Sequence, residues 1–347
     1  QAEGNLPTQR GLGIAAWQLG SQTLSAPNHP IRADLAERLE SLDLDAAEVE
    51  RILAEAEAAL AEELVPGYRA LQSAVAGAEA RSDATPGVLH HPAGEAYYAA
   101  ALAHHLSLPV TPAEVHDIGL AEVDRLKAEL LEAMGELGVP VDELGFAQGI
   151  ATVSATAPVV PLRSDEEREA FLADTEMFIR ENTAAFEDMF ATMPASPLEV
   201  RRPRPSREGA GGAYYRPPPT DGGRPGIYYL GLAGSAFPMD TYATTNYHEA
   251  IPGHHFQLAL QRESEGLPLL QRATAFTGYA EGWGLYAERL AAEAGLYDDD
   301  PLGDIGRLRM ELLRAGRVVP TGQQLDSFAL EDFEQPAFLQ LLLIVAR

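Results

Sequence analysis

The spacing of apolar residues along the chain predicts a protein built mainly from helices. Between Ile31 and Tyr68, leucine, isoleucine and valine recur every three or four positions in a segment rich in alanine and glutamate. This recurrence matches one face of a helix. The Pro66-Gly67 pair near the end of the segment predicts that the helix stops there.

Two further helices have explicit start signals. The stretch Thr111-Pro-Ala-Glu114 combines an N-cap threonine, a proline at the first helical position and a glutamate at the third. The helix that it opens is expected to reach about Gly138. The stretch Ser164-Asp-Glu-Glu167 is a second start signal, for a helix that should extend through Phe190.

The pattern changes after residue 196. Proline, glycine and arginine dominate residues 197–225, which is typical of loops and extended chain. Residues 227–232 are predicted to form a short strand. Helical spacing then returns, and three helices are expected: from Asp240 through the histidine-rich segment to about Glu265, from Ala273 to Ala294, and from Pro301 to Val319.

These segments together predict a mainly α, multi-helical fold with few short strands. We expect an N-terminal helical half in residues 1–196, and metal-site and C-terminal helices in residues 240–347. Residues 197–239 are expected to form a loop and short-strand region over the site, because long loops often cover functional sites. The three parts are predicted to form one catalytic unit.

Charge narrows the choice of partners. The chain of 347 residues has a net charge of −27. This charge disfavours nucleic acids and anionic membranes, because phosphate groups are bound by clustered lysine and arginine. The acidity is typical of a highly soluble protein, and attraction of cationic substrates is the alternative interpretation.

Cysteine is absent, which excludes disulfides, thiolate metal ligands and a thiol nucleophile. No run approaches the roughly 18 apolar residues of a membrane span, so membrane insertion is not expected. The apolar run LQLLLIVAR at the end of the sequence is predicted to be a core helix. The first residues, QAEGNLPTQR, lack a signal-peptide pattern. A cytoplasmic location is therefore favoured, with export through a cleaved signal as the alternative.

The histidines around residue 250 carry the strongest chemical signal. The segment YHEAIPGHH, residues 247–255, begins like the zinc-protease motif H-E-x-x-H. In that motif two histidines share one helix face and the glutamate acts as a general base. Here Pro252 replaces the second histidine. On a regular helix His254 would point about 120° away from His248, and His255 would lie roughly 10 Å along the axis.

Pro252 also suggests how the two histidines could meet. Proline has no N–H to bond the carbonyl of His248, and Gly253 tolerates backbone angles that other residues avoid. We therefore predict a kink, or a bulge of one or two residues, inside the helix, which returns His254 to the face of His248. Such irregularities are frequent at functional sites. A structural surface cluster of histidines is the alternative interpretation.

A catalytic zinc needs three protein ligands and an open position. The segment TGYAEGWGLYAE, residues 277–288, supplies Glu281 and Glu288, which are seven residues apart and so share a helix face. Small residues around Glu281 would let a metal approach closely. We predict that Glu281 is the third ligand and that Glu288 orients a histidine from outside the ligand set. A solvated helix position is the alternative for Glu288.

The same residues resemble a known bacterial family. HEAIPGHHFQ followed by EGWGLYAERLA is similar to the signature H-E-x-x-P-G-H and E-G-W-[AG]-x-Y-x-E of the family called domain of unknown function 885. The stretches around His116 and Tyr214-Tyr215, and RLRMELLRAGRVV, are also similar to family stretches. Family members are usually longer, and after Val319 this sequence passes at once to PTGQQLDSF, which resembles a later family segment.

The family in turn resembles helical zinc peptidases of the thimet-oligopeptidase and carboxypeptidase-Taq types. This resemblance implies a zincin-like fold with the active cleft between two helical halves. It also implies one zinc per chain, held by His248, His254 and Glu281, with Glu249 as the base. Related members often have tyrosine after the second signature histidine, which favours His254 over His255 as the ligand. Manganese or cobalt would suit the same ligands.

Other residues are predicted to contact the substrate. Tyr215 and Tyr229, on either side of the glycine- and proline-rich loop, are the favoured donors to a developing oxyanion. Arg224 is a candidate for binding a substrate carboxylate, and His255 and His116 are candidates for hydrogen bonding.

The predicted function is a zinc-dependent metallopeptidase for short peptides. A metallohydrolase acting on a non-peptide amide or an ester is one alternative, and a non-catalytic metal- or peptide-binding protein is another. The glutamate in the general-base position, Glu249, argues against the second alternative, because a structural site needs no base. A fourth ligand such as His255 would favour it.

Overall fold

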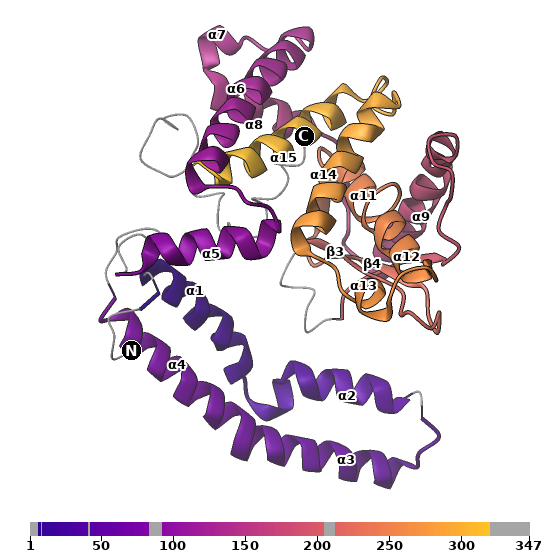
Figure 1. Cartoon of the computed structure of the whole chain (residues 1–347). Coiled ribbons are helices and arrows are strands. Elements are labelled where there is room, and N and C mark those ends of the chain that lie inside the picture. Colours follow the sequence, from indigo (N-terminus) through magenta and orange to yellow (C-terminus); the bar gives the residue numbers. More distant parts are fainter. Residues whose placement is uncertain (1–5, 8, 41, 83–91, 205–211, 320–347) are drawn as a thin grey trace. The chain divides into compact units, whose positions relative to one another are not determined.

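The computed structural model describes residues 6–7, 9–40, 42–82, 92–204 and 212–319. The chain divides into two compact units: residues 1–101 with 203–209, and residues 102–202 with 210–347. The second unit contains parts of all three segments predicted from the sequence. The mainly α fold with few short strands is confirmed (Figure 1). The predicted core helix in LQLLLIVAR lies outside the described residues.

The first unit consists of helices. α1 packs along α4 and α2 packs along α3 (Figure 1). The bounds are α1 (Gln9–Gly20), α2 (Pro30–Glu40), α3 (Ala46–Ala59) and α4 (Val65–Glu79), followed by α5 (Gly94–Leu106), which crosses the boundary between the units.

The predicted stop at Pro66-Gly67 is wrong. A π-helical turn, Leu60–Leu64, joins α3 directly to α4, so the chain remains helical through Glu79. Pro66 lies in the first turn of α4. In the π-helical turn the N–H of Val65 bonds the carbonyl of Leu60, five residues back. This shift from the usual i−4 pattern accommodates a residue without an N–H.

The second unit contains the remaining helices and every described strand. Its helices are α6 (Pro112–Glu136), α7 (Val141–Leu144), α8 (Phe146–Thr156), α9 (Asp165–Glu187), α11 (Tyr242–Glu249), α12 (His254–Glu263), α13 (Leu269–Ala273), α14 (Thr277–Glu293) and α15 (Pro301–Arg317). Its strands are β1 (Val159–Pro161), β2 (Leu198–Arg201), β3 (Ala213–Arg216), β4 (Gly226–Leu230) and β5 (Ala236–Pro238). Among these described helices, none has the length and apolar character needed to cross a bilayer.

Both predicted start signals lie where the helices begin. Thr111 caps α6 and Ser164 caps α9, each in a capping box with the glutamate three positions later. In this arrangement the two side chains satisfy N–H groups that the helix itself leaves free. α6 ends close to the predicted residue, whereas α9 ends at Glu187, before the predicted Phe190.

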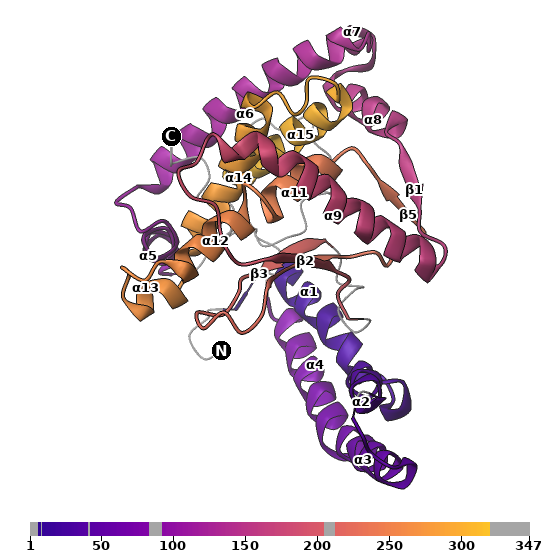
Figure 2. The same ribbon diagram turned by 90° about the vertical axis from the view of Figure 1, so that its right-hand side faces the viewer.

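A three-stranded sheet supports the helices that carry the histidines. β4 is its central strand, parallel to β2 and antiparallel to β3. Tyr215 of β3 pairs with Tyr228 of β4, and Tyr214 pairs with Tyr229. Because paired residues share a face and neighbours alternate, Tyr215 and Tyr228 lie on one face and the other two tyrosines on the opposite face. α9, α11 and α12 lie on one side of this sheet (Figure 2).

The helix that carries the first histidine is buried on all sides. In α11 every residue except Thr245 is buried, and α9, α14, α15 and β3 all pack against it. Its tyrosines, Tyr242 and Tyr247, pack against the aromatic rings of α9, including Phe178. Such burial on all faces is unusual for a helix with this many polar residues. The polar groups of α11 must therefore be satisfied by specific partners or by a ligand.

The interface between α6 and α15 offers a test of packing. We expect Leu126→Ala in α6 to lower the free energy of unfolding by about 2–5 kcal/mol, because this buried side chain leaves a cavity. The matched control is Leu131→Ala in the same helix, where the side chain is 44% exposed and a change within about 0.5 kcal/mol is expected. Urea denaturation measures both values, and equal effects would contradict this account of the interface.

Candidate metal centre

The chain between the two histidine helices turns sharply. α11 ends at Glu249 and α12 begins at His254, with a cis peptide bond between Ile251 and Pro252. A Cβ on Gly253 would lie 1.9 Å from the carbonyl oxygen of His248, so only glycine permits this close approach. The prediction of a kink or bulge within one helix is therefore wrong. The helix ends and a second one begins, because Ala250 and Gly253 both have non-helical backbone angles.

The turn brings the predicted ligands together. The imidazole rings of His248 and His254 have centroids 4.5 Å apart. Glu281 of α14 lies between them, with its two oxygens 3.4 Å from His248 Nε2 and 3.7 Å from His254 Nε2. One ligand atom from each of the three residues lies within 4.8 Å of the other two. Ligands at zinc distances on a tetrahedron are about 3.4 Å apart, so small side-chain movements would close the set around an ion.

A buried carboxylate fixes the first histidine from behind. Glu288 of α14, which is 1% exposed, accepts a hydrogen bond from Nδ1 of His248 at 2.7 Å and one from Thr244 at 2.8 Å. Arg314 of α15 binds the same carboxylate at 2.9 and 3.1 Å. Because a carboxylate oxygen only accepts, Nδ1 of His248 carries a proton, and loss of the second proton from the ring leaves the lone pair on Nε2. The structure thus places Glu288 where the sequence predicted it.

Glycine in α14 lets the imidazole approach. A Cβ on Gly284 would lie 2.5 Å from Cε1 and 2.8 Å from Nε2 of His248. The ring therefore lies directly against the backbone of α14. This contact explains one of the small residues around Glu281, which the sequence analysis interpreted as room for close approach.

The pKa values of the two histidines differ because their neighbours differ. Burial alone lowers the pKa of His248, but its hydrogen bonds to Glu281 and Glu288 outweigh burial and raise it to about 10. For His254, burial and then the nearby charge of His248 lower the pKa to about 3. A neutral imidazole is the form that binds metals, and His254 is already in that form at neutral pH.

The residues present fit a divalent cation. Two imidazoles and a carboxylate are the donor set of many catalytic zinc sites. Three acidic residues (Glu249, Glu281 and Glu288) lie around this site, with Arg314 among the charges that act on all three. Enclosed carboxylates are costly unless cations balance them, and here His248 and Arg314 supply part of that balance. The trio can therefore hold a metal ion.

Glu249 lies next to the first ligand and is ready for acid–base chemistry. Its side chain is 7% exposed, and its Oε2 has no hydrogen-bond partner in the described part of the chain. Burial raises the pKa of Glu249 to about 7. The hydroxyl of Tyr228 on β4 is also buried and lacks a partner among the described residues. Burial and then the charge of Glu249 raise the pKa of Tyr228 well above its usual value.

Tyr215 and His255 bind each other. The Tyr215 hydroxyl lies 2.9 Å from Nδ1 of His255, and the backbone of Ser196 also bonds this histidine. The imidazole of His255 is thus held by protein groups, and it is not among the three described residues that could share a metal. Burial lowers the pKa of His255 to about 4, so the ring is neutral.

The structure does not bring the remaining predicted residues into the ligand group. Tyr229 stacks on Tyr214, with ring centroids 4.8 Å apart, on the opposite face of β4 from Tyr228. Arg224 donates from both terminal nitrogens to backbone carbonyls of its own loop. His116 lies on α6, a helix that packs along α15. Their predicted contacts with a substrate stay predictions.

Two residues of the site were not predicted from the sequence. Arg314 and Thr244 both bind Glu288, and neither was singled out as a candidate. A signal for Arg314 was present, because Arg307, Glu311 and Arg314 fall on one face of α15 and all are buried. Charged residues that recur at helical spacing beside apolar ones indicate buried ion pairs when the partner helix is known.

A comparison with protein families identifies the chain's relatives. The family model described as "Bacterial protein of unknown function (DUF885)" matches residues 2–321. The chain belongs to this family. No curated protein matches it.

Two solved structures are similar to this member of the family. One is a protein from Colwellia psychrerythraea described as a lipoprotein, with 30% sequence identity and a TM-score of 0.84 over 99% of this chain and 60% of that one. The other, from Shewanella oneidensis, is described as a lipoprotein of unknown function. It has 17% identity and a TM-score of 0.58 over 98% of this chain and 64% of that one, so its likeness concerns the fold alone. The chain spans less than two thirds of the length of either.

The contact between Gly284 and His248 predicts a specific loss of metal affinity. We expect Gly284→Ala to weaken zinc binding at least tenfold, because the added methyl group displaces the imidazole and outer contacts of this kind tune affinity about 10–100-fold. The control is Gly135→Ala in α6, where a Cβ meets no atom within 4 Å. Competition with a chromophoric chelator measures both, and wild-type affinity in Gly284→Ala would contradict the geometry.

Proposed function

We propose that this protein is a zinc-dependent metallopeptidase that hydrolyses short peptides. One observation carries the proposal: His248, His254 and Glu281 offer three ligand atoms within 4.8 Å, beside the buried carboxylate of Glu249 with its unpartnered oxygen. Two histidines, a glutamate ligand and an adjacent glutamate base match the chemistry of metal-assisted amide hydrolysis. The restriction to short peptides follows from the cleft that the family resemblance implies.

The three ligands would hold the ion, and neighbouring residues fix the orientation of the histidine side chains at the site. A bound zinc supplies a Lewis acid that polarises a carbonyl oxygen and lowers the pKa of water. Glu288 bonds Nδ1 of His248 and is itself held by Arg314, so Nε2 is the nitrogen of this ring that would face the ion. His255 is held by Tyr215 and Ser196. This supports three protein ligands with one position left for substrate or water, rather than a closed structural site.

Glu249 is assigned as the general base. With a pKa of about 7, its carboxylate form is present near neutral pH and its conjugate acid can return the proton. Oε2 takes a proton from the attacking water and then delivers it to the leaving nitrogen. A base with a pKa near the working pH is the most effective for such a transfer.

Tyr228 is assigned as a hydrogen-bond donor at the reacting centre. Its hydroxyl is buried without a described partner, on the face of β4 that Tyr215 shares. The Tyr215 hydroxyl is engaged with His255, and Tyr229 lies on the other face of the sheet. Preorganised donors in a water-poor site stabilise a developing oxyanion. Tyr228 is therefore a stronger candidate than the two tyrosines that the sequence favoured.

The site of action is proposed to lie outside the cytoplasm. The protein from Colwellia psychrerythraea, 30% identical over nearly all of this chain, is described as a lipoprotein. Lipoproteins are exported, so this likeness supports export over the cytoplasmic location that the sequence favoured.

Metal content and peptide cleavage in two proteins test the proposal together. Elemental analysis is expected to find one zinc per chain in both the wild type and Glu249→Gln. A mixed dipeptide and tripeptide assay should detect cleavage by the wild type, with kcat about 10²–10⁴-fold lower in Glu249→Gln because the base is lost. Stoichiometric zinc without cleavage of any peptide would favour a different amide or ester substrate or a non-catalytic role. Absence of zinc after reconstitution would refute the metal site.

The role of Tyr228 has its own test. We expect Tyr228→Phe to lower kcat about 10²-fold, because one hydrogen-bond donor is removed and the ring still fills the core. Zinc affinity should not change, since the hydroxyl is not a ligand. Tyr229→Phe is the matched control on the opposite face of the same strand and should keep a kcat close to that of the wild type. Equal kcat values in the two variants would exclude Tyr228.

A further inference from the structure

The two histidine ligands differ in what holds them. Nδ1 of His248 bonds Glu288 at 2.7 Å. Nδ1 of His254 is buried and has no hydrogen-bond partner among the described residues. A metal-binding histidine almost always donates its second N–H to an oxygen acceptor, which fixes the ring and its tautomer. His254 therefore needs an acceptor that the described contacts do not provide.

Gln257 supplies an acceptor in the right place. It is three residues after His254 on α12, it is 7% exposed, and its Oε1 is also buried without a described partner. Residues three apart lie on neighbouring parts of one helix face. Side chains on a helix lean toward its N-terminus, so the carboxamide of Gln257 leans toward His254.

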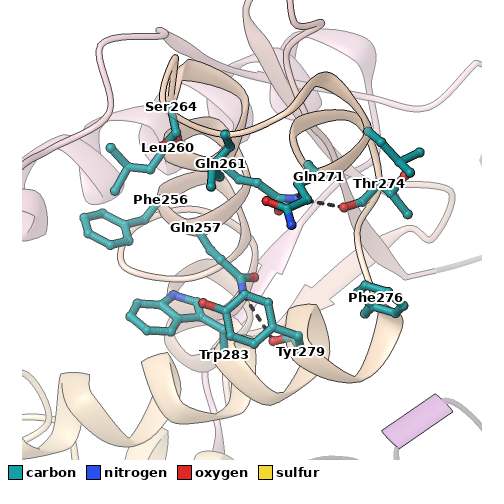
Figure 3. Close-up of a pocket in the computed structure, with 12 residues that line it drawn as sticks. Phe256, Gln257, Leu260, Gln261, Ser264, Gln271, Thr274, Phe276, Tyr279 and Trp283 are labelled. Atoms are coloured by element: carbon teal, nitrogen blue, oxygen red, sulfur yellow. Dashed lines mark hydrogen bonds between the residues drawn. The ribbon is translucent and has the colours of Figure 1, made fainter. Parts of the chain in front are cut away.

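The orientation of the carboxamide is set by its other end. Nε2 of Gln257 donates to the backbone carbonyl of Tyr279 on α14 at 3.2 Å (Figure 3). A carbonyl can only accept, so nitrogen must occupy that position and Oε1 remains the free acceptor. Figure 3 shows Gln257 extending from α12 toward Tyr279 and Trp283 of α14. Tyr279 lies two residues before Glu281, so one side chain connects the helices of two metal ligands.

The other unpartnered acceptors among the described side chains are less suited. Asn246 and Glu249 each have one such oxygen, and both lie on α11. Asn246 donates to the carbonyl of Tyr242 one turn earlier on α11. Glu249 is the proposed base and must keep its oxygen free for the proton. The buried hydroxyls of Tyr228 on β4 and of Tyr297 after α14 also lack described partners. Of all these acceptors, Gln257 is the one that lies on the same helix as His254.

We propose that Gln257 is a positioning residue for the metal site: Oε1 accepts a hydrogen bond from Nδ1–H of His254 and directs Nε2 of that ring to the ion. The inference rests on the proposed metal site but not on the proposed peptidase activity. A torsional adjustment of either side chain closes the bond, because the two groups are one turn apart on α12. Gln257 thus orients the ring of His254 in the same way that Glu288 orients the ring of His248.

Three variants separate this role from a merely structural one. Gln257→Leu removes both the acceptor and the bond to Tyr279. Gln257→Glu keeps an acceptor, which is now a carboxylate as in Glu288, but loses the donor. Gln261→Leu is the matched control one turn later on α12, where the carboxamide nitrogen bonds the carbonyls of Gln271 and Thr274. It removes a comparable helix-to-loop connection far from the ligand nitrogen.

The experiment measures the affinity of each purified protein for zinc by chelator competition, together with the visible spectrum of the cobalt-loaded form. Gln257→Leu should bind zinc about 10–100-fold more weakly than the wild type and show an altered cobalt spectrum. Gln257→Glu should bind at least as tightly as Gln261→Leu, and both should remain close to the wild type. Thermal unfolding of the metal-free proteins checks that all three variants fold.

The outcomes decide between the possibilities. Wild-type affinity in Gln257→Leu would overturn the proposal. Equal weakening in Gln257→Glu and Gln257→Leu would also overturn it, because the donor to Tyr279 would then be the important group. If Gln257→Leu does not fold, ¹⁵N NMR of imidazole in the zinc-loaded wild type and Gln257→Glu replaces it, and a missing protected Nδ1–H of His254 would refute the bond. This experiment does not measure peptide cleavage, so its result can be interpreted even if the protein is not a peptidase.

Discussion

The carboxylate of Glu288 is the interaction on which the site depends. It is almost fully buried and accepts hydrogen bonds from Thr244 and His248 of α11 and from Arg314 of α15. A buried carboxylate is costly unless all its acceptor positions are used, and here four donor contacts offset that cost. The same contacts hold three helices in register. The orientation of the His248 ring and the packing of the core around α11 therefore have one common cause.

A second constraint is that two glycines permit unusually close contacts. One contact joins two backbone segments, and the other joins an imidazole ring to a helix backbone. Gly253 permits the turn that ends α11 and begins α12, and Gly284 permits the imidazole of His248 to lie on α14. Both positions exclude even a methyl group. The three predicted ligands therefore come from three helices. His248 lies near the end of α11, His254 begins α12, and Glu281 lies one turn before Gly284 on α14. Such a set has little freedom to rearrange, which favours a site formed before a metal arrives.

The two histidines of the site differ in the hydrogen-bond partners of Nδ1, and this difference has a chemical use. His248 is tied to a carboxylate and an arginine, whereas His254 is neutral and lacks a described partner on Nδ1. Glu249 and Tyr228 are likewise buried without described partners. Polar groups left unpaired in a core are expensive, and they are common where a ligand or a reaction will use them. Among the described residues, two of these unpaired groups belong to His254, a predicted ligand, and to Glu249, the neighbour of His248.

The elements with local causes could be predicted from the sequence. Capping boxes began α6 and α9, periodicity predicted the mainly α fold, and the spacing of Glu281 and Glu288 predicted one helix face for both. The grouping of His248, His254 and Glu281 was predictable because the motif and the acids are chemically distinctive. Tertiary structure alone decided the rest. The ending of α11, the pairing of Arg314 with Glu288 and the burial of the Tyr228 hydroxyl depend on contacts between segments far apart in sequence, and local patterns do not encode such contacts.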